Sequence, residues 1–573
     1  MAGIGDRARR IVSVAMVLAV ALVLSGCSKS TDTAGERSSK GSTTTGVNGG
    51  TNRECSPPGD TTPLKVDAVG IDGRDFDMVS FDGTRIRTHW FPNPAATPEN
   101  PAPTVLMGPG WSLAGATDVN QSEVLGSIDI ASLLNAGYNV ATWDPRGFGA
   151  SDGYATVDSA AFEGRDVQQL IDWLATLPGV ELEAERNPRM GMVGGSYGGG
   201  IQLVTAAIDC RVDAIVPIVA WHSLRTSLYK SETVKIGWAG VLANAAATSK
   251  VDAHITSAWE AAQTTGVLSA EDIRWFIERG PGDMIEKVEV PTLLIHGTID
   301  TLFTLDEAVT NYRILEKHRV PVAMLWNCDG HGVCLTSRGD PNRARSAAIG
   351  WLDRYVKDDK SVEVVSGFDA IDQNGDRYVA DRYVGRSDSH VTAQGKGTLA
   401  LSAEGGSGPL DPSTAAGQML AGIAADLTPT KATNALNIEI TDSEDSGGDH
   451  ERGTLLLGEP VVEVTYTGER SAETVDSATT RRPTRVFAQL VDESDGKVVG
   501  NQVTPIKVVL DGKEHKARVP LEVISFSLKP QAKLTLQLVA RTVAYATPEL
   551  GGSIEFSSVE VKLPVGDWLK PVN

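Results

Sequence analysis

Short apolar runs alternate with amphipathic segments from about Val66 to Val356. One such segment, residues 167–174, has apolar side chains at positions i, i+3, i+4 and i+7, which is the spacing of one helix face. Six runs have the length and composition of buried strands: 104–108, 139–144, 190–195, 214–220, 292–297 and 322–327. Buried strands alternating with helices are typical of a mostly parallel sheet covered by helices, so we expect an α/β domain over residues 63–360.

Two local signals mark the ends of this domain. The Asp82-Gly83 pair lies between two short runs and predicts the turn of an opening hairpin. Asp340 followed by Pro341 predicts the N-cap and first residue of a helix. We expect that helix to close the domain.

The strand pattern stops over about residues 221–288, where helical stretches replace it. One of them opens with a capping-box spacing from Ser269 to Asp272. Two interpretations stay open. The insertion is either a helical cap over a pocket, or a helical crossover in which Trp259 and Trp275 are ordinary core residues.

After residue 360 the chain consists of short alternating segments with Gly, Asp and Ser between them. This spacing predicts an all-β domain, a sandwich of the jelly-roll kind, over residues 361–573. The run DAIDQNGD, residues 369–376, resembles a calcium-binding loop, but its Gly375 stands at the wrong offset for an EF-hand. An ordinary Asn-Gly turn is the favoured interpretation.

The N-terminus has the order of an export signal, with three arginines before the apolar run Ile11–Leu24. The following LSGC resembles the lipobox of bacterial lipoproteins. That resemblance implies a signal peptide over residues 1–26 and a lipid on the sulfur of Cys27, which would tether the protein to the membrane outside the cytoplasm. A plain secretory signal with an incidental cysteine is the alternative. Residues 27–62 are rich in Ser, Thr and Gly and predict a flexible tether.

The charge and the cysteines narrow the class of protein further. A formal net charge of −21 argues against a nucleic-acid partner, because a phosphate-binding surface needs positive charge. Besides Cys27, four cysteines remain, and an even number in an oxidising compartment favours disulfides. We expect one between Cys328 and Cys334, and pair Cys55 with Cys210 by elimination. No metal or cofactor is expected.

The strongest chemical signal is GGSYG, residues 194–198, which follows a buried strand and precedes a helical segment. This is the context of a nucleophile elbow, in which Ser196 sits on a tight turn and the flanking glycines avoid collisions with the neighbouring strand and helix. Ser196 is therefore the candidate nucleophile.

A serine hydroxyl needs a general base, and the base needs an acid that orients it. Asp300 and His331 each follow a predicted strand, at the edge where parallel sheets build their sites. We expect His331 as the base and Asp300 as its partner, with a Cys328–Cys334 ring limiting the motion of the histidine loop.

Rival residues are weaker candidates. His296 lies within a strand and fits a core histidine, while His222 begins the insertion and fits a pocket wall. Asp329 is so close to His331 in sequence that a tight loop would turn it away.

The oxyanion of a tetrahedral intermediate needs hydrogen-bond donors. The backbone N–H of Tyr197, directly after the nucleophile, is the first candidate. The backbone N–H of Trp111, in the loop GPGWS (108–112), is the second.

The motif around Ser196, the phrase VPTLLIHGTID (290–300), the segment DPRGFGASDG (144–153), the insertion and the trailing β-domain together resemble the S15 peptidase and CocE-type hydrolases. The resemblance covers about residues 66–570. It implies an α/β-hydrolase core, a helical cap, a C-terminal jelly roll and hydrolysis of an ester or an amide, in some members after a penultimate proline.

Two departures from that group affect specificity. Relatives commonly have a tyrosine in the oxyanion loop, where this chain has Pro109, Gly110 and Trp111, so main-chain donors are expected instead. No clear acidic motif is present that would bind the free amino terminus of a peptide, so dipeptidyl-peptidase specificity does not follow.

The leading hypothesis is a membrane-tethered, extracytoplasmic serine hydrolase acting on a small ester or a short peptide. A noncatalytic envelope lipoprotein that retains the fold is the alternative. A zinc hydrolase using Cys328, His331 and Cys334 is disfavoured, because it would leave Ser196 without a base and would need reduced thiols outside the cytoplasm.

Overall fold

The computed structural model describes residues 55–58, 64–70, 73–121, 128–337, 339–411, 413, 421–441, 453–471 and 482–572. The predicted signal peptide, Cys27 and most of the predicted tether lie outside these residues. The chain divides into two units, Met1–Ser56 and Pro57–Asn573, and all helices and strands of the described residues lie in the second. None of the helices in these ranges is long and apolar enough to cross a membrane.

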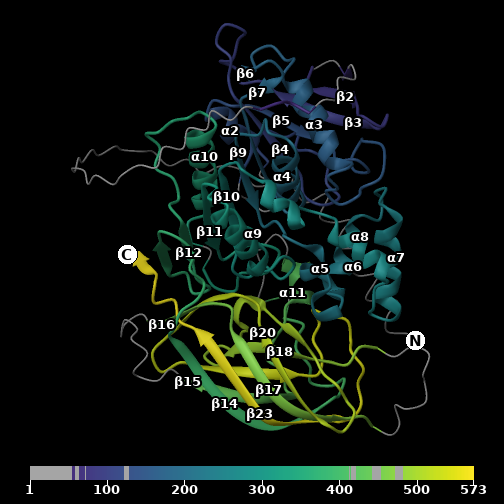
Figure 1. Ribbon diagram of the computed structural model, residues 1–573, viewed down its shortest axis with the longest axis vertical. Coiled ribbons are helices and arrows are strands. Elements are labelled where there is room, and N and C mark those ends of the chain that lie inside the picture. The colour runs from purple at the N-terminus through teal and green to yellow at the C-terminus, as the bar shows by residue number, and fades with distance from the viewer. Residues whose placement is uncertain are drawn as a thin grey trace, which may run out of the picture. The chain divides into compact units, whose positions relative to one another are not determined.

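A 12-stranded sheet forms the centre of the α/β part (Figure 1). In spatial order its strands are β1 (Lys65–Val69), β2 (Asp75–Val79), β3 (Arg85–Phe91), β5 (Asn139–Trp143), β4 (Thr104–Gly108), β8 (Met190–Gly195), β9 (Ala214–Ile218), β10 (Thr292–Gly297), β11 (Val322–Asn327), β12 (Phe368–Ile371), β13 (Arg377–Ala380) and β24 (Lys570–Val572). Neighbours from β5 to β12 pair in parallel, and the flanking pairs are antiparallel. The predicted mostly parallel sheet is confirmed, and it contains all six predicted strands.

Helices cover both faces of the sheet because successive side chains on each strand point in opposite directions. The covering helices are α2 (Ile130–Asn135), α3 (Glu163–Leu174), α4 (Tyr197–Ile208), α9 (Leu305–Lys317) and α10 (Arg343–Tyr355). Met192 of β8 belongs to the apolar cluster that includes α3 and α4, whereas Val193 belongs to the cluster that includes α2 and α10. A short separate sheet pairs β6 (Leu182–Ala184) with β7 (Asn187–Pro188).

The last of these helices begins later than the sequence predicts. Its N-cap is Asn342 rather than Asp340. The side chain of Asp340 instead accepts a hydrogen bond from the backbone N–H of Asn342 at 2.9 Å, and this bond stabilises a turn ahead of the helix.

The insertion between β9 and β10 is helical, as predicted, and its longer helices lie side by side (Figure 1). It consists of α5 (Leu224–Leu228), the 3-10 turn η1 (Lys230–Glu232), α6 (Ile236–Ala245), α7 (Ala253–Thr264), α8 (Ala270–Ile277) and the 3-10 turn η2 (Gly282–Lys287). Ser269 is the N-cap of α8, since its hydroxyl accepts a hydrogen bond from the N–H of Asp272 at 3.0 Å.

The C-terminal part is all-β apart from short helical turns. One four-stranded sheet has the order β14 (His390–Ala400), β23 (Ser553–Pro564), β17 (Val461–Glu469), β20 (Glu514–Pro520), and the other β15 (Ala435–Thr441), β22 (Lys533–Val539), β18 (Arg485–Asp492), β19 (Thr504–Lys507). The remaining elements are the pair β16 (Thr454–Gly458) and β21 (Ile524–Leu528), helix α11 (Ala421–Leu427) and the 3-10 turn η5 (Val499–Asn501). All pairs are antiparallel, and side chains from both larger sheets share one apolar core. A sandwich fits this arrangement, while a jelly-roll order of the strands stays a prediction.

The two parts are joined more closely than a boundary at residue 360 implies. Strands β12, β13 and β24 extend the large sheet beyond that residue. Trp326 of β11 packs against Phe368 of β12 with ring centroids 4.6 Å apart, and Leu457 and Val523 of the β-domain belong to the same apolar cluster. The expected boundary therefore falls inside a continuous sheet and core.

The hairpin between β12 and β13 contains the segment that resembled a calcium loop. Gly375 has a φ of +92°, and the carboxylate of Asp372 accepts the N–H groups of Asn374 and Asp376 at 2.9 Å each. These contacts form the Asn-Gly turn that the sequence favours.

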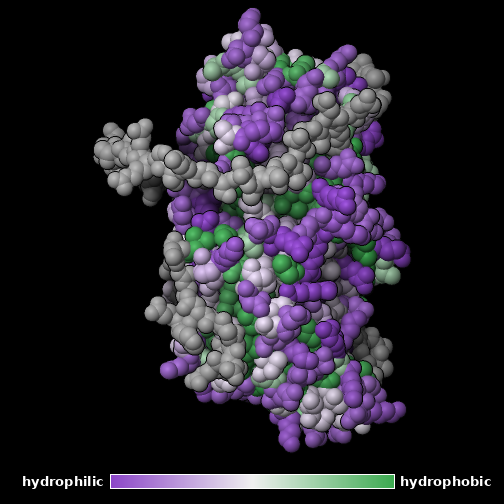
Figure 2. All heavy atoms as spheres, turned by 60° about the vertical axis from the view of Figure 1, so that its left-hand side comes forward, coloured by the Kyte–Doolittle hydropathy of each residue, from purple (hydrophilic) through white to green (hydrophobic). Residues whose placement is uncertain are grey.

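Hydrophilic residues dominate the face shown in Figure 2, and the hydrophobic ones lie in small, separate patches.

A fragment that ends at residue 360 is expected to misfold. It lacks β12, β13 and β24, so β11 becomes an open edge and the apolar surface of Trp326 is uncovered. We expect it to aggregate or to unfold in urea without a cooperative transition, as followed by circular dichroism, whereas the chain from residue 28 to 573 unfolds cooperatively. A soluble fragment with a sharp transition would show that the α/β part folds independently of these strands.

Candidate active site

Ser196 occupies a strained turn between β8 and α4. Its φ is 56°, a left-handed value that non-glycine residues rarely adopt, and its N–H donates to the carbonyl of Ile218 at 2.8 Å. A Cβ atom on Gly198 would lie 2.1 Å from the carbonyl oxygen of Gly108, and one on Gly194 would lie 2.6 Å from the same atom. The two glycines therefore permit the close approach of β4 that the elbow requires.

Ser196, His331 and Asp300 lie in a continuous hydrogen-bonded chain. The Oγ atom of Ser196 is 2.9 Å from Nε2 of His331, and Nδ1 of His331 is 2.7 Å from Oδ2 of Asp300. An ionised carboxylate only accepts hydrogen bonds, so Nδ1 carries the ring proton and Nε2 is left to accept the proton of Ser196. The geometry is that of a serine nucleophile beside a general base.

The carboxylate of Asp300 is fully buried but well supplied with donors. Its Oδ1 accepts the N–H groups of Leu302 and Phe303 at 2.9 and 2.8 Å, and its Oδ2 also accepts the backbone N–H of His331 at 3.0 Å. Burial acts to raise the pKa of Asp300, but the charge and hydrogen bonds of His331 outweigh it, so the pKa lies below its ordinary value. The carboxylate is thus ionised at neutral pH.

The rival residues take structural positions. Nε2 of His296 is 2.8 Å from the carbonyl of Phe303, to which it donates, and Nδ1 of His222 is 2.9 Å from Oδ1 of Asn311. The carboxylate that lies 2.7 Å from Nδ1 of His331 is that of Asp300.

The ring of His331 is flanked by two aromatic side chains that the sequence did not single out. Phe303 and Trp238 meet it edge to face, with ring centroids 5.2 and 5.8 Å away. The indole N–H of Trp238 donates to the hydroxyl of Thr301 at 3.0 Å, and that hydroxyl donates to the carbonyl of His331 at 3.0 Å. Helix α6 of the insertion therefore reaches the histidine loop, a contact that no local pattern could reveal.

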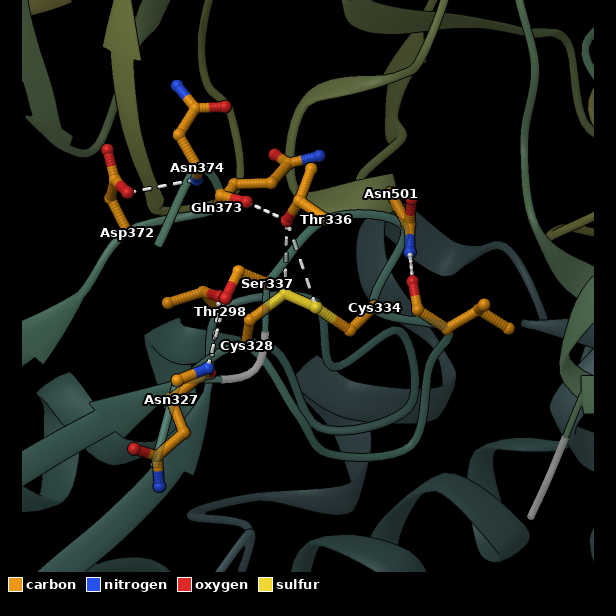
Figure 3. The surroundings of a disulfide bond; sticks show 12 residues. Thr298, Asn327, Cys328, Cys334, Thr336, Ser337, Asp372, Gln373, Asn374 and Asn501 are labelled. Carbon is orange, nitrogen blue, oxygen red and sulfur yellow. Dashed lines mark hydrogen bonds between the residues drawn. A yellow bond between two sulfur atoms is a disulfide. The ribbon is translucent and has the colours of Figure 1, made fainter. Parts of the chain in front are cut away.

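The histidine loop is closed by the expected disulfide between Cys328 and Cys334, whose Cα atoms are 5.6 Å apart (Figure 3). The hydroxyl of Thr336 lies 3.6 and 3.8 Å from the two sulfur atoms. Because these sulfurs are bonded to each other, they are not available as thiolate ligands of zinc. Cys55 and Cys210 are also disulfide-bonded.

The two residues expected at the oxyanion site lie next to each other. Tyr197 is the first residue of α4, where backbone N–H groups have no acceptor within the helix. Its phenol donates to Oε1 of the buried Glu163 at 3.3 Å, and burial raises the pKa of the phenol. The ring of Trp111 packs on that of Tyr197 at 5.4 Å, and its indole N–H donates to the carbonyl of Leu242 in α6 at 3.0 Å. The roles of their backbone N–H groups stay predictions.

A buried ion pair between Arg146 and Asp166 joins the segment after β5 to helix α3. Arg146, from the DPRGFGASDG segment, makes two hydrogen bonds of 2.7 and 2.8 Å to Asp166 and one of 3.0 Å to Asp82. The arginine thus ties the segment after β5 to helix α3 and to the opening hairpin.

A cavity of about 120 Å³ lies against Ser196. Its wall is mainly apolar and comes largely from the insertion, for example Trp221, Leu228, Leu242, Ala258, Trp259 and Phe276. Arg225 is the one charged side chain among the described residues that line it, and none of them is Asp or Glu.

The cavity decides between the two interpretations of the insertion. Trp259 lines the cavity, as a cap residue would. Trp275 is instead a core residue that stacks on His254 at 5.3 Å. The insertion therefore covers a pocket beside Ser196 and has a small core of its own.

Among the described residues, no group of three or more His, Cys, Asp or Glu side chains is arranged to hold a metal ion.

Replacing Gly198 with Ala is expected to destabilise the elbow. The new methyl group would collide with the carbonyl of Gly108, and overpacking of this kind costs about 1–3 kcal/mol. Gly350→Ala in α10 is the matched control, since a methyl group there meets only ordinary contacts and should raise stability by about 0.5–1 kcal/mol. Urea unfolding monitored by fluorescence measures both, and equal stabilities of the two variants would contradict the steric account.

Comparisons with known proteins show which families and folds the chain resembles. Residues 82–332, which contain Ser196, Asp300 and His331, match the sequence model of the family described as X-Pro dipeptidyl-peptidase (S15 family). A curated protein of Escherichia coli, the uncharacterized 31.7 kDa protein in the traX-finO intergenic region, is 36% identical over 90 residues, which are 16% of this chain and 30% of that protein.

Two solved structures share the fold over most of their length. A CocE/NonD family hydrolase from Staphylococcus aureus aligns with a TM-score of 0.59 at 11% identity, over 86% of this chain and 93% of that one. An aminopeptidase from a marine sediment Thaumarchaeota archaeon aligns with a TM-score of 0.61 at 14% identity, over 89% of this chain and 98% of that one. The matched S15 segment and the contacts of Ser196 together support a serine hydrolase, and the solved structures share its fold.

Proposed function

We propose that the protein is a membrane-tethered, extracytoplasmic serine hydrolase that cleaves an ester or amide bond through an acyl-enzyme. The observation that carries the proposal is the hydrogen-bonded chain from Ser196 through His331 to Asp300, at the edge of an apolar cavity. The tether and the location rest on the predicted lipobox at Cys27. The disulfides are in keeping with an oxidising compartment.

The reaction follows from the positions of these groups. Nε2 of His331 accepts the proton of Ser196 as Oγ attacks the carbonyl carbon of the substrate, and the carboxylate of Asp300 stabilises the resulting imidazolium. The N–H groups of Tyr197 and Trp111 donate to the oxyanion. His331 then gives its proton to the leaving alcohol or amine, which departs and leaves an acyl group on Ser196. A water molecule repeats the sequence, releasing the acid and restoring the serine.

The cavity favours an apolar acyl group. A benzene-sized group fits an apolar cavity of roughly 150 Å³, and the cavity beside Ser196 is of similar size. A substrate with a free α-ammonium group would need a carboxylate partner there, because an unpaired buried charge is costly, and none lines the cavity in the described residues. We therefore favour esters or amides of uncharged apolar acids over peptides recognised by their amino terminus.

The choice between ester and amide is testable with chromogenic substrates. The protein lacking residues 1–27 should hydrolyse aryl esters of short apolar acids faster than X-Pro aryl amides and should react with a fluorophosphonate probe. Ser196→Ala should lose the probe reaction and at least about 10⁴-fold of kcat, because the nucleophile is gone. Unchanged activity in Ser196→Ala would rule out the mechanism. A wild type that neither hydrolyses these substrates nor reacts with the fluorophosphonate probe would favour a noncatalytic lipoprotein.

The place of the acyl group is testable on helix α7. Ala258→Phe should fill part of the cavity and lower kcat/KM for a hexanoyl aryl ester about 10-fold or more relative to the acetyl ester. Ala253→Phe changes an exposed position of the same helix and should leave that ratio unchanged. If both variants keep the wild-type ratio in initial-rate measurements, the acyl group binds elsewhere.

A further inference from the structure

A buried turn of the β-domain lies against both loops that carry the acid and the base. It comprises η5 and Gln502, between β18 and β19. Gly500 and Asn501 have φ values of 64° and 55°, left-handed conformations that suit glycine and asparagine. Asn501 and Gln502 are 3% and 7% exposed, so the turn is interior although it belongs to a loop.

Gln502 holds the loop that carries the acid. Its side-chain N–H donates to the main-chain carbonyl of Asp300 at 2.8 Å, in a buried bond. The carboxylate of Asp300 is held by donors of its own loop and of the histidine loop, so its backbone and its side chain are fixed from different sides.

Asn501 holds the loop that carries the base. Its side-chain N–H donates to the carbonyl of Val333 at 2.9 Å, inside the ring closed by Cys328 and Cys334 (Figure 3). Val333 is two residues after His331 and fully buried. The ring limits the shape of the loop, and Asn501 connects that ring to the β-domain.

The turn itself is fixed by the hairpin between β12 and β13. The N–H of Gly500 donates to the side-chain carbonyl of Gln373 at 2.6 Å, and the main-chain carbonyl of Gln373 accepts the hydroxyl of Thr336, next to the disulfide. One rigid segment of two adjacent residues therefore sets the distance between the acid loop and the base loop.

We infer that Asn501 and Gln502 are positioning residues for the hydrolytic reaction, through which the β-domain keeps Asp300 and His331 in register with Ser196. The inference rests on the proposed function. Neither side chain lines the cavity, so both act through the two loops and not on the substrate. Misplacement of a catalytic group by about 1 Å can lower a rate about 100-fold, whereas binding of the substrate in the cavity does not depend on this turn.

The test compares side-chain donors in the full-length chain. Gln502→Met keeps the length of the side chain without its donor, and Asn501→Gly removes the donor but tolerates the left-handed backbone. Each should lower kcat for an aryl ester about 10-fold and the double variant further, with KM within about 2-fold of wild type. The rate of fluorophosphonate labelling should fall in parallel.

Gln489→Met is the matched control. Gln489 is a buried glutamine of β18 that donates to the carbonyl of Thr430 at 2.9 Å, within the β-domain. Its loss should lower the melting temperature but leave kcat per folded molecule within about 2-fold. Circular dichroism gives the folded fraction of each variant.

The outcomes separate the inference from the proposed function. If the wild type is active and kcat is unchanged in both variants, the inference alone is overturned. The same holds if the loss of kcat in each variant only matches its unfolded fraction. It also holds if Gln489→Met lowers kcat per folded molecule to the same extent. A wild type that neither hydrolyses esters nor reacts with the probe would overturn the proposed function, and the inference with it.

Discussion

The buried carboxylate of Asp300 is the constraint on which the arrangement of the site depends. It accepts four N–H groups, two from its own loop and two from His331. A carboxylate without water is costly unless its lone pairs are satisfied, so the loops after β10 and β11 must fold together around it. The same bonds fix the tautomer of His331 and leave its Nε2 facing Ser196, as the proposed general base requires.

The other half of the site depends on close backbone approach. Gly194 and Gly198 let β8 and α4 lie against the carbonyl of Gly108, and this places Ser196 in a left-handed turn at the end of the strand. The parallel sheet brings this turn and the loops after β10 and β11 to the same edge, although they are far apart in sequence. Ser196 and His331 therefore meet because of strand order, and the insertion adds the apolar wall of the cavity beside Ser196.

The β-domain is part of the same structure rather than an appended module. Its strands share a core with β11 and β12, and its turn at residues 499–502 contacts both loops of the site. A large sheet has two open edges, and here one of them is extended by the last strand of the chain, β24. The C-terminal part thus extends the sheet and also contacts the loops that carry Asp300 and His331.

The sequence by itself determined six strands of the parallel sheet but not β12, together with the elbow at Ser196, the helical insertion and the candidates Asp300 and His331. Each of these depends on local periodicity or on a motif with a fixed context. Capping was predictable only in part: Ser269 caps its helix, but Asp340 stabilises a turn and the helix starts at Arg343. Contacts between distant segments were decided only by the tertiary structure. Trp238 beside His331, the pairing of Arg146 with Asp166, the return of β24 to the sheet and the bonds from Asn501 and Gln502 have no local signature, since each joins groups that only folding brings together.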